Sequence, residues 1–350
     1  MTRILARLLA FALILSACST QLSVTEGDRS GENGRVATPL GATATPTLGP
    51  VLPPAPRREE PESYHAVLTM PWDDPITLDP AISRETRSHL FVGSIFSGLV
   101  RFDHELRLQP DLAERIEVDE TGTVYTFTIR QGAQFHDGRR IAAYDVKYSI
   151  DRATDPTLMS DTAALYLGDI VGVRERLRGL AAHVDGVQVL DARTLSITID
   201  KPKAFFLAKM TYPSAAVVDR QTVEGAGVDW WKGEINGSGP FKLREWIPGE
   251  RLVLERSTGY HAPSSLESVI FPIRQGVPMD MYATDAIDVA MIGGSSIDRA
   301  LDPSNNLADQ LVVFPQFNTH YVGFNARGAP FDARKARRAF AMAVDRRAMV

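Results

Sequence analysis

Few residues of this sequence have the types and the spacing that catalysis or metal binding requires. The 350 residues contain no His-Glu-x-x-His zinc motif, no Gly-x-Ser-x-Gly nucleophile elbow and no Walker Gly-Lys-Ser/Thr loop. Gly225 and Gly227 begin like a dinucleotide-binding loop, but Trp230 occupies the position of its third glycine. His136 and Asp137 could form a metal-binding pair, although a polar turn accounts for them better. We therefore expect no catalytic centre, no metal site and no cofactor.

Cys18, the one cysteine of the chain, is a candidate for covalent modification. Residues 1–17 carry two arginines and then a short apolar run, which is typical of a signal peptide and too short to span a bilayer. Leu15-Ser16-Ala17-Cys18 looks like a bacterial lipobox, in which the thiol receives diacylglycerol and the cysteine becomes the new N-terminus. The alternative is a plain signal peptide with an incidental cysteine. Acyl chains would anchor the protein to a membrane, since each buried methylene contributes roughly 0.8 kcal/mol.

The overall composition is that of an ordinary globular protein with room for about two domains. The chain is 44% hydrophobic and 23% charged, with a net charge of −5. This mildly acidic balance, without a basic patch, argues against nucleic acid as a partner. Residues 18–63 are rich in Thr, Pro, Gly, Ser and Ala, so they cannot bury enough apolar surface to fold. We interpret them as a disordered tether that reaches roughly 40 Å before a folded part that begins near Tyr64.

A strand, a tight turn and a helix are predicted between Tyr125 and Ala153. Apolar and polar residues alternate from Tyr125 to Ile129, which is typical of a half-buried strand. Asp137-Gly138 is a turn pair, and the period changes to that of a helix after Ala142. The helix is expected to turn one set of residues inward and another outward: Val146, Tyr148, Ile150 and Ala153 inside, and Lys147, Asp151 and Arg152 outside.

Other elements are expected on both sides of this run. Ser83–Leu99 is predicted to be a helix that Ser83 caps. The remaining predicted elements are a strand at Ala66–Met70, a hairpin of Val187–Val189 and Thr194–Ile199, a helix at Phe205–Tyr212, and strands at Phe241–Trp246 and Arg251–Glu255. Residues 154–184 are less clearly patterned.

The run from Tyr125 to Ala153 resembles a motif of the bacterial extracellular solute-binding proteins of family 5, which serve peptide and nickel ABC importers. In that family a Tyr-Thr-Phe-like strand precedes Arg-x-Gly, Phe-x-Asp-Gly and a helix entered through Ala-x-Asp-Val. All four parts occur here in order. The family usually has Thr or Ser at the position of Ala142, so the missing cap should cost on the order of 1 kcal/mol.

Further motifs of the same family follow the family's order along Tyr64 to Val350. They are Leu78-Asp79-Pro80, Gln109-Pro110-Asp111-Leu112-Ala113, Gly237-Ser238-Gly239-Pro240-Phe241, Tyr260-His261, Asp285-Ala286-Ile287-Asp288, and Pro330-Phe331-Asp332 followed by Arg337. His261 stands where the family usually has Trp. The glycines of Gly237-Ser238-Gly239 are expected to permit a tight turn near the junction of the lobes.

The resemblance implies an α/β protein with the type II periplasmic-binding-protein fold, in which two lobes close around a ligand. The domain boundaries that it implies are 1–17 for the signal peptide, 18–63 for the lipidated tether, 64–110 and 205–312 for a discontinuous domain I, 111–204 for an inserted subdomain, and 313–350 for the start of the second lobe. The sequence stops inside an expected helix, and relatives continue further. We therefore expect the second lobe to be incomplete.

The family also implies a function in binding and transport. The chain would capture di- or oligopeptides outside the cytoplasm, as a lipid-anchored monomer, and deliver them to permease and ATPase subunits of an ABC importer. A nickel chelate, an oligosaccharide or another small solute remains an alternative ligand. A surface lipoprotein that senses without transport is the alternative from another functional class.

Four residues are the candidates for ligand contact in this part of the family fold. Ser88 and His89 open the stretch that faces the cleft in relatives, and Tyr212 and Ser214 lie in a second such stretch. The competing interpretation for each is a structural or solvent-facing role. Nickel-binding relatives carry an Arg in the segment that corresponds to Tyr212–Ala215, so its absence here favours peptide over nickel. Trp230, Trp231 and Trp246 could stack on a ligand, but packing in the core or between strands is the better interpretation.

Overall fold

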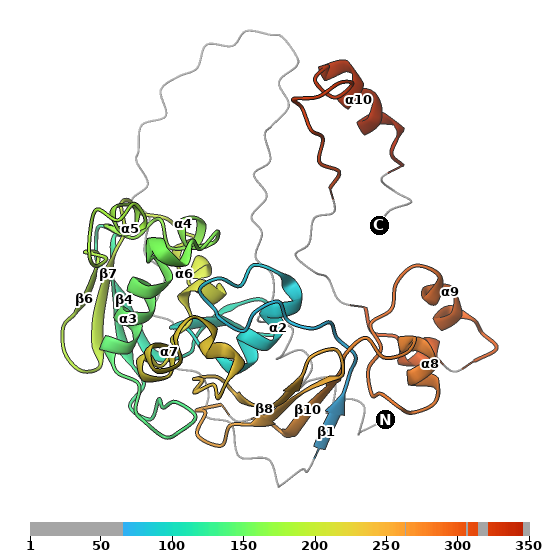
Figure 1. Cartoon of the computed structure of the whole chain (residues 1–350), viewed down its shortest axis with the longest axis horizontal. Helices are drawn as coiled ribbons and strands as arrows, with labels where there is room; N and C mark the ends of the chain where they lie inside the picture. The colour runs from blue at the N-terminus through green and yellow to red at the C-terminus, as the bar shows by residue number, and fades with distance from the viewer. Residues whose placement is uncertain (1–65, 263, 306, 314–320, 346–350) are drawn as a thin grey trace. The chain divides into compact units, whose positions relative to one another are not determined.

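The structure is a computed structural model that describes residues 66–262, 264–305, 307–313 and 321–345 (Figure 1). The predicted signal peptide, Cys18 and the tether lie outside these residues. The described chain falls into two compact units, one that ends at Val313 and one that begins after it. Each unit is described by itself below.

The first sheet of unit 1 joins segments that are far apart in the sequence. Its strand order is β1 (Ala66–Thr69), β10 (Leu266–Pro272), β9 (Arg251–Arg256) and β8 (Phe241–Ile247). β1 runs parallel to β10, while β10, β9 and β8 pair antiparallel. The strands predicted at Ala66–Met70, Phe241–Trp246 and Arg251–Glu255 are confirmed as β1, β8 and β9, and β10 was not predicted.

Helix α2 (Thr86–Ile95) packs in the core of this first sheet. The ring of Phe91 meets the ring of Phe271 of β10 edge to face, with centroids 4.9 Å apart. The predicted start of this helix is wrong, because Ser83 is not its cap and the helix begins at Thr86. Ser83 belongs to a turn in which its N–H donates to the carbonyl of Asp79 at 3.1 Å.

The second sheet of unit 1 is built from one continuous part of the chain. Its order is β4 (Ala113–Val118), β5 (Val124–Ile129), β7 (Thr194–Thr198) and β6 (Val187–Val189), all antiparallel. On β5 the side chains of Tyr125, Phe127 and Ile129 are buried, as the alternating pattern predicts. These side chains enter a second hydrophobic core, distinct from the core of the first sheet.

Helix α3 (Ala143–Ala153) lies beside the second sheet and contacts β6. Val146, Ile150 and Ala153 are buried, which confirms most of the predicted inner face. The prediction for Arg152 is wrong: its side chain is only 11% exposed, because it pairs with the buried carboxylate of Asp79. The helical period identified the apolar face, but it cannot indicate that a charged residue is buried in an ion pair.

Shorter elements connect these parts within the described residues. They are β2 (Val100–Phe102), β3 (Leu108–Pro110), η1 (Pro156–Leu158), α4 (Ala163–Tyr166), α5 (Val173–Leu177), α6 (Phe206–Lys209), η2 (Pro213–Ala215), α7 (Arg220–Ala226), η3 (Gly227–Lys232), α8 (Pro278–Ala283), α9 (Ser295–Leu301) and η4 (Ala308–Gln310). The predicted helix at Phe205–Tyr212 is thus a shorter α6 followed by η2. Trp230 and Trp231 are buried in the core of the first sheet, as expected.

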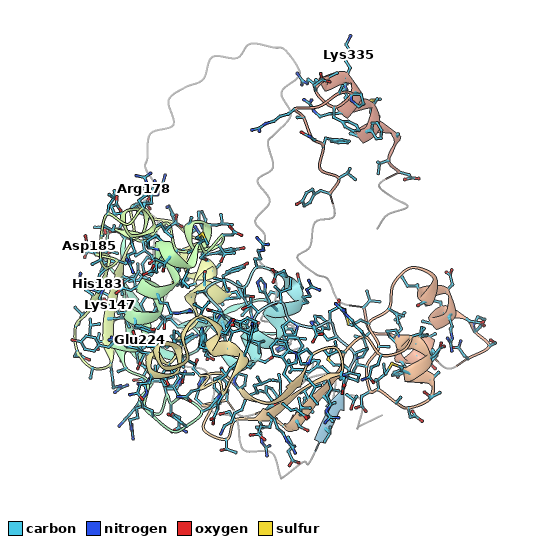
Figure 2. The ribbon with its side chains drawn as sticks, in the orientation of Figure 1. Lys147, Arg178, His183, Asp185, Glu224 and Lys335 are labelled. Carbon is cyan, nitrogen blue, oxygen red and sulfur yellow. The ribbon has the colours of Figure 1, made fainter. Side chains whose placement is uncertain are left out.

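The surface around α5 and α7 carries charges of both signs. Figure 2 labels Arg178, His183, Asp185 and Glu224, which are all exposed. No helix among the described residues is long and apolar enough to cross a membrane.

Unit 2 is described from Tyr321 to Asp345 and contains helix α10 (Arg334–Ala343). Phe324, Phe331 and Phe340 form a ring cluster with centroids 4.9 to 5.8 Å apart. Arg337 donates from Nη1 to the carbonyl of Phe331 at 2.6 Å. The family motif in this region therefore packs as a small local cluster.

Candidate ligand-binding site

Ser88 lies at the start of α2 and is fully buried. Its Oγ accepts hydrogen bonds from the backbone N–H groups of Ile76 (3.0 Å) and Thr77 (3.4 Å), and donates to Glu85 at 3.3 Å. The hydroxyl therefore fastens the preceding loop to the helix. Of the four predicted residues, Ser88 has the clearest structural role.

His89 and Tyr212, which are 123 positions apart in the sequence, meet in the structure. The hydroxyl of Tyr212 lies 3.4 Å from Nε2 of His89, and the two rings meet edge to face with centroids 5.1 Å apart. Tyr166 of α4 stacks on Tyr212 with a centroid separation of 3.4 Å and an interplanar angle of 7°. We call these three residues the aromatic cluster.

The aromatic cluster holds a neutral imidazole in a low-dielectric surrounding. Burial lowers the pKa of His89, although the carbonyl of Ser83 and the charge of Glu85 oppose this shift. Burial also raises the pKa of Tyr166, and its hydrogen bond with Tyr212 opposes that. At neutral pH the imidazole of His89 and the phenol of Tyr166 are therefore uncharged, and both side chains are buried.

Ser214 follows Tyr212 in η2 and is 2% exposed. Its Oγ is buried and has no hydrogen-bond partner among the described residues, and the same is true of Ser83. A buried hydroxyl without a partner loses roughly 1–3 kcal/mol relative to a satisfied one. Neither hydroxyl is paired with a base, so the arrangement can bind but does not form an activated nucleophile.

Sequence reasoning missed Tyr166. It lies in the weakly patterned stretch 154–184, on a helix of four residues that is too short to show a period. The only signal available was an aromatic residue in the short apolar run Ala163–Leu167, which does not separate a core residue from a site residue.

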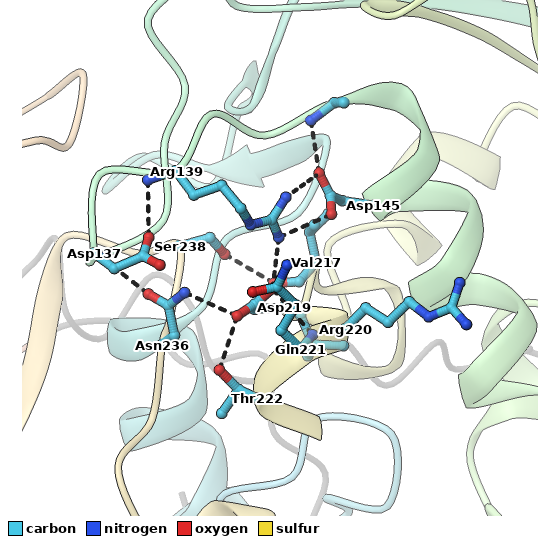
Figure 3. A network of polar contacts seen from close by, with 12 residues as sticks. Asp137, Arg139, Asp145, Val217, Asp219, Arg220, Gln221, Thr222, Asn236 and Ser238 are labelled. Carbon is cyan, nitrogen blue, oxygen red and sulfur yellow. Dashed lines mark hydrogen bonds and ion pairs between the residues drawn. The ribbon is translucent and has the colours of Figure 1, made fainter. Parts of the chain in front are cut away.

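Helix α3 contacts η2, which follows Tyr212, and ion pairs hold α3 at both ends. Near its start, Arg139 donates from Nη2 to Asp145 of α3 at 3.0 Å and to Asp219 at 2.6 Å (Figure 3). Burial alone would raise the pKa of Asp219, but hydrogen bonds from Asn236, Thr222 and Arg139 hold it below its usual range. The carboxylate of Asp219 is therefore charged at neutral pH.

The other end of α3 is held by a second buried ion pair. Arg152 donates to both carboxylate oxygens of Asp79, at 2.8 and 2.5 Å. The indole N–H of Trp230 donates to Asp79 at 3.1 Å. Asp79 therefore links α3 to the core of the first sheet, which explains the aspartate of the Leu78-Asp79-Pro80 motif.

His136 has a structural role that leaves little room for a metal. Its ring nitrogens face the backbone of Gly237 and Gly239, at 3.2 and 3.0 Å. In the part of the chain that the structure describes, no group of three or more His, Cys, Asp or Glu side chains could hold a metal ion.

Comparison with known proteins places these features in a family. Residues 107–350 match the family described as bacterial extracellular solute-binding proteins, family 5, middle region. The chain belongs to this family. Its members are solute-binding proteins, and the resemblance read from the sequence motifs is confirmed.

Curated relatives match over most of this chain. The periplasmic oligopeptide-binding protein OppA of Escherichia coli is 30% identical over 259 residues, which are 72% of this chain and 47% of that protein. The probable deoxycholate-binding periplasmic protein YgiS of the same species is 29% identical and covers 78% of this chain and 52% of that protein. The chain thus spans about half the length of the curated relatives it matches.

Solved structures confirm the fold class. The murein tripeptide binding protein MppA of Escherichia coli superposes with a TM-score of 0.73 at 29% identity, over 81% of this chain and 56% of that one. The chain therefore has the α/β architecture of the type II periplasmic binding proteins, and its homologues work outside the cytoplasm.

Proposed function

We propose that this protein is the substrate-binding lipoprotein of an ABC importer, which captures peptides outside the cytoplasm and delivers them to the permease. The observation that carries the proposal is the family match over residues 107–350. Relatives whose names specify oligopeptides, dipeptides or murein peptides support the peptide class. Binding without bond making also agrees with a site that contains buried hydroxyls but no paired base.

The residues proposed to touch the ligand are His89, Tyr212 and Ser214, together with Tyr166. An uncharged aromatic surface with few fixed charges suits ligands that vary in side chain, because its contacts are mainly with ring faces. Ser214 would gain the hydrogen bond that it lacks. Ser88, although predicted with these residues, is proposed to act only by holding the loop before α2.

The proposed domains follow the boundaries expected from the family. Domain I takes 64–110 and 205–312, the inserted subdomain takes 111–204, and the second lobe begins near 313. The origin of the strands supports this assignment: β1, β8, β9 and β10 come from the first two ranges, and β4 to β7 come from the third.

The identity of the solute is the least constrained part of the proposal. Relatives at 28–30% identity carry names that specify oligopeptides, deoxycholate and glutathione. A nickel chelate and an oligosaccharide are the other family ligands to test, and a sensor without transport is the other functional class.

A binding screen tests the proposed ligand class. The purified protein is incubated with pools of di- to pentapeptides and, in separate arms, with deoxycholate, glutathione, nickel–histidine and oligosaccharides. Gel filtration then removes free solute, and mass spectrometry identifies what remains bound. We expect the protein that carries both lobes to retain peptides, and Tyr212→Ala to weaken their affinity at least tenfold. The matched control is Tyr144→Ala, which removes an exposed tyrosine and should leave the affinity unchanged.

Two outcomes would contradict the peptide proposal: retention of a solute from another arm in place of peptides, or equal affinities of the Tyr212 and Tyr144 variants. A second, genetic experiment compares peptide uptake by cells with and without the gene for this protein. Transport predicts lost uptake and neighbouring genes for permeases and ATPases, while a sensor predicts unchanged uptake.

The membrane anchor is proposed to be a lipid on Cys18. Mass spectrometry of the mature protein from bacterial membranes should find diacylglycerol on this residue. Cys18→Ser should release the protein from the membrane fraction. An unmodified Cys18 on the mature membrane-bound protein would contradict the anchor without affecting the peptide proposal.

A further inference from the structure

Two buried histidines lie where the second sheet and its turns meet the loops of the first sheet. His136 faces the loop Gly237–Gly239, and His261 faces Asp111, the residue that follows β3. Gln134 lies close to the second loop, because a Cβ added at Gly259 would be 1.9 Å from the side-chain nitrogen of Gln134. We call this boundary the seam; its residues are Asp111, Arg130, Gln134 and His136 on one side and Gly237–Gly239 and Gly259–His261 on the other.

Both ring nitrogens of His136 are engaged at the seam. Nδ1 accepts from the N–H of Gly237 at 3.2 Å, so the proton must lie on Nε2, which then donates to the carbonyl of Gly239 at 3.0 Å. A second proton on Nδ1 would point at the N–H of Gly237, and one hydrogen bond would become a repulsion. The two contacts of the His136 ring at the seam therefore require its neutral form.

His136 packs closely against the loop Gly237–Gly239. A Cβ at Gly237 would lie 2.6 Å from Cε1 of the ring and 2.2 Å from the carbonyl oxygen of Ile95. Gly239 is equally close to the end of α2, where a Cβ would lie 2.6 Å from the carbonyl oxygen of Ser94. Close approach, and not a left-handed backbone, therefore explains both glycines, and the loop is wedged between the ring and α2.

Burial lowers the pKa of His136 to about 4. The charged groups that face it are Lys242 on β8, which lowers the pKa further, and Asp137 on its own turn, which opposes the shift together with the carbonyl of Gly239. Burial therefore dominates over the neighbouring charges.

His261 is neutral for the same reason. Nε2 of its ring lies 3.3 Å from Oδ1 of Asp111, which also accepts a hydrogen bond from Tyr260 at 2.6 Å. Burial lowers the pKa of His261 to about 4; Arg130 and Arg101 act in the same direction, and Asp111 opposes them. At neutral pH this contact is thus a hydrogen bond to a carboxylate and not an ion pair.

The neighbouring charged joint does not titrate in the same range. Burial lowers the pKa of Arg139, but Asp145 and Asp219 raise it above its usual value. The pKa of Asp219 lies below its usual range. Arg139 and Asp219, at the centre of Figure 3, therefore stay ionised where the two imidazoles gain protons.

We propose that the seam is an acid-sensitive joint: protonation of His136 separates the 131–141 turn from the loop at 237–239, while both hydrophobic cores stay folded. The proposal concerns the two sheets of unit 1 and does not depend on the ligand. Its consequence is that mild acid increases the freedom of the 111–204 part before the protein unfolds.

Hydrogen exchange with mass spectrometry on the full-length protein tests the joint between pH 7 and pH 4.5. After correction for intrinsic exchange rates, we expect peptides from the seam to open more at pH 4.5, by about 10- to 100-fold for each histidine that gains a proton. Peptides from β5 and α3 should keep their protection. Loss of protection throughout unit 1 at once, or no change at the seam, would overturn the proposal.

A variant that cannot titrate provides the matched control. His136→Asn keeps an acceptor near the place of Nδ1 but cannot gain a proton. This variant should lose most of the pH dependence at the 131–141 turn and the loop at 237–239. A pH dependence equal to that of the wild type would refute the proposal. If the variant does not fold, imidazole NMR of the wild type decides: titration of His136 near pH 6.5 contradicts the joint, and titration near pH 4 supports it.

Discussion

Single buried charges hold this fold together more firmly than its many surface ion pairs. The guanidinium of Arg139 serves both Asp145 and Asp219, and the side chains of these two aspartates are 9% and 4% exposed. Without Arg139 both carboxylates would remain in place with fewer donors. Loss of one partner is costly in such a case, because the remaining charge is buried and uncompensated.

Arg139→Met should lower the free energy of unfolding by about 2–3 kcal/mol; because the arginine is about one-third exposed, the effect is below the value for a fully buried pair. Urea unfolding at pH 7 measures the change. The control is Arg251→Met, which removes an exposed pair with Glu245 and should change the free energy of unfolding far less. Equal losses in the two variants would contradict the role given to Arg139.

The burial and the contacts of a residue could be predicted from the sequence only where a local pattern indicated them. The inner face of α3 followed from its period, but the burial of Arg152 did not, since its partner Asp79 lies 73 positions away. The contact of His89 with Tyr212 is equally non-local. Both residues were chosen individually as candidates, and only the fold reveals that they meet.

At the scale of elements, the N-terminus of α3 has only one of the two hydrogen bonds of a capping box. The carboxylate of Asp145 accepts from the N–H of Ala142 at 2.8 Å, which is one of the two hydrogen bonds of a capping box. Ala142 has no side-chain oxygen that could accept the second hydrogen bond, the one from the backbone N–H of Asp145. The cap therefore depends entirely on Asp145, the residue that also binds Arg139.

Ala142→Thr should raise the free energy of unfolding by about 0.5–1 kcal/mol, since a threonine hydroxyl supplies the missing half of the cap. Ala142→Val is the matched control, because valine has the shape of threonine without the hydroxyl. Chemical denaturation compares the two variants. The explanation fails if valine stabilises the protein as much as threonine does.

The secondary-structure predictions were correct for elements that are long and regular. The strands β5, β7, β8 and β9 and the helix α3 match the expected positions, because alternation or a helical period extends over five or more residues. The helix predicted from Ser83 began too early, since the turn after Asp79 takes up that residue. Elements as short as α4 and α5 were not predicted, because four or five residues do not establish a period.

At the scale of the whole molecule, acid should act on stability in two ranges of pH. His136 and His261 have folded pKa values of about 4, below the ordinary value of 6.5, so the unfolded chain binds their protons first. Their contribution is complete above about pH 6.5 and is lost as the pH falls toward 4. Burial would raise the pKa of Asp169, but Lys203 and Lys209 lower it, so its contribution is lost only below about pH 4.

We therefore expect the free energy of unfolding to fall by a few kcal/mol between pH 7 and pH 4.5, and again below pH 4. Urea midpoints at pH 7, 5.5, 4.5 and 3.5 measure both losses. His136→Asn should reduce the first loss and leave the second. A stability that stays constant from pH 7 to 4.5 would contradict the buried, neutral state of these imidazoles.

The pairing of β1 with β10 also determines the order in which the protein can be assembled during synthesis. Ala66 has its partner at Leu266, so the first strand to leave the ribosome must wait for some two hundred residues before it can be placed. The strands β4 to β7 all fall between Ala113 and Thr198, and they can associate during that interval. Meanwhile Leu68 and Met70, which end fully buried, remain in contact with water or with a chaperone. The beginning of the folded chain is thus among the last parts to reach its native position.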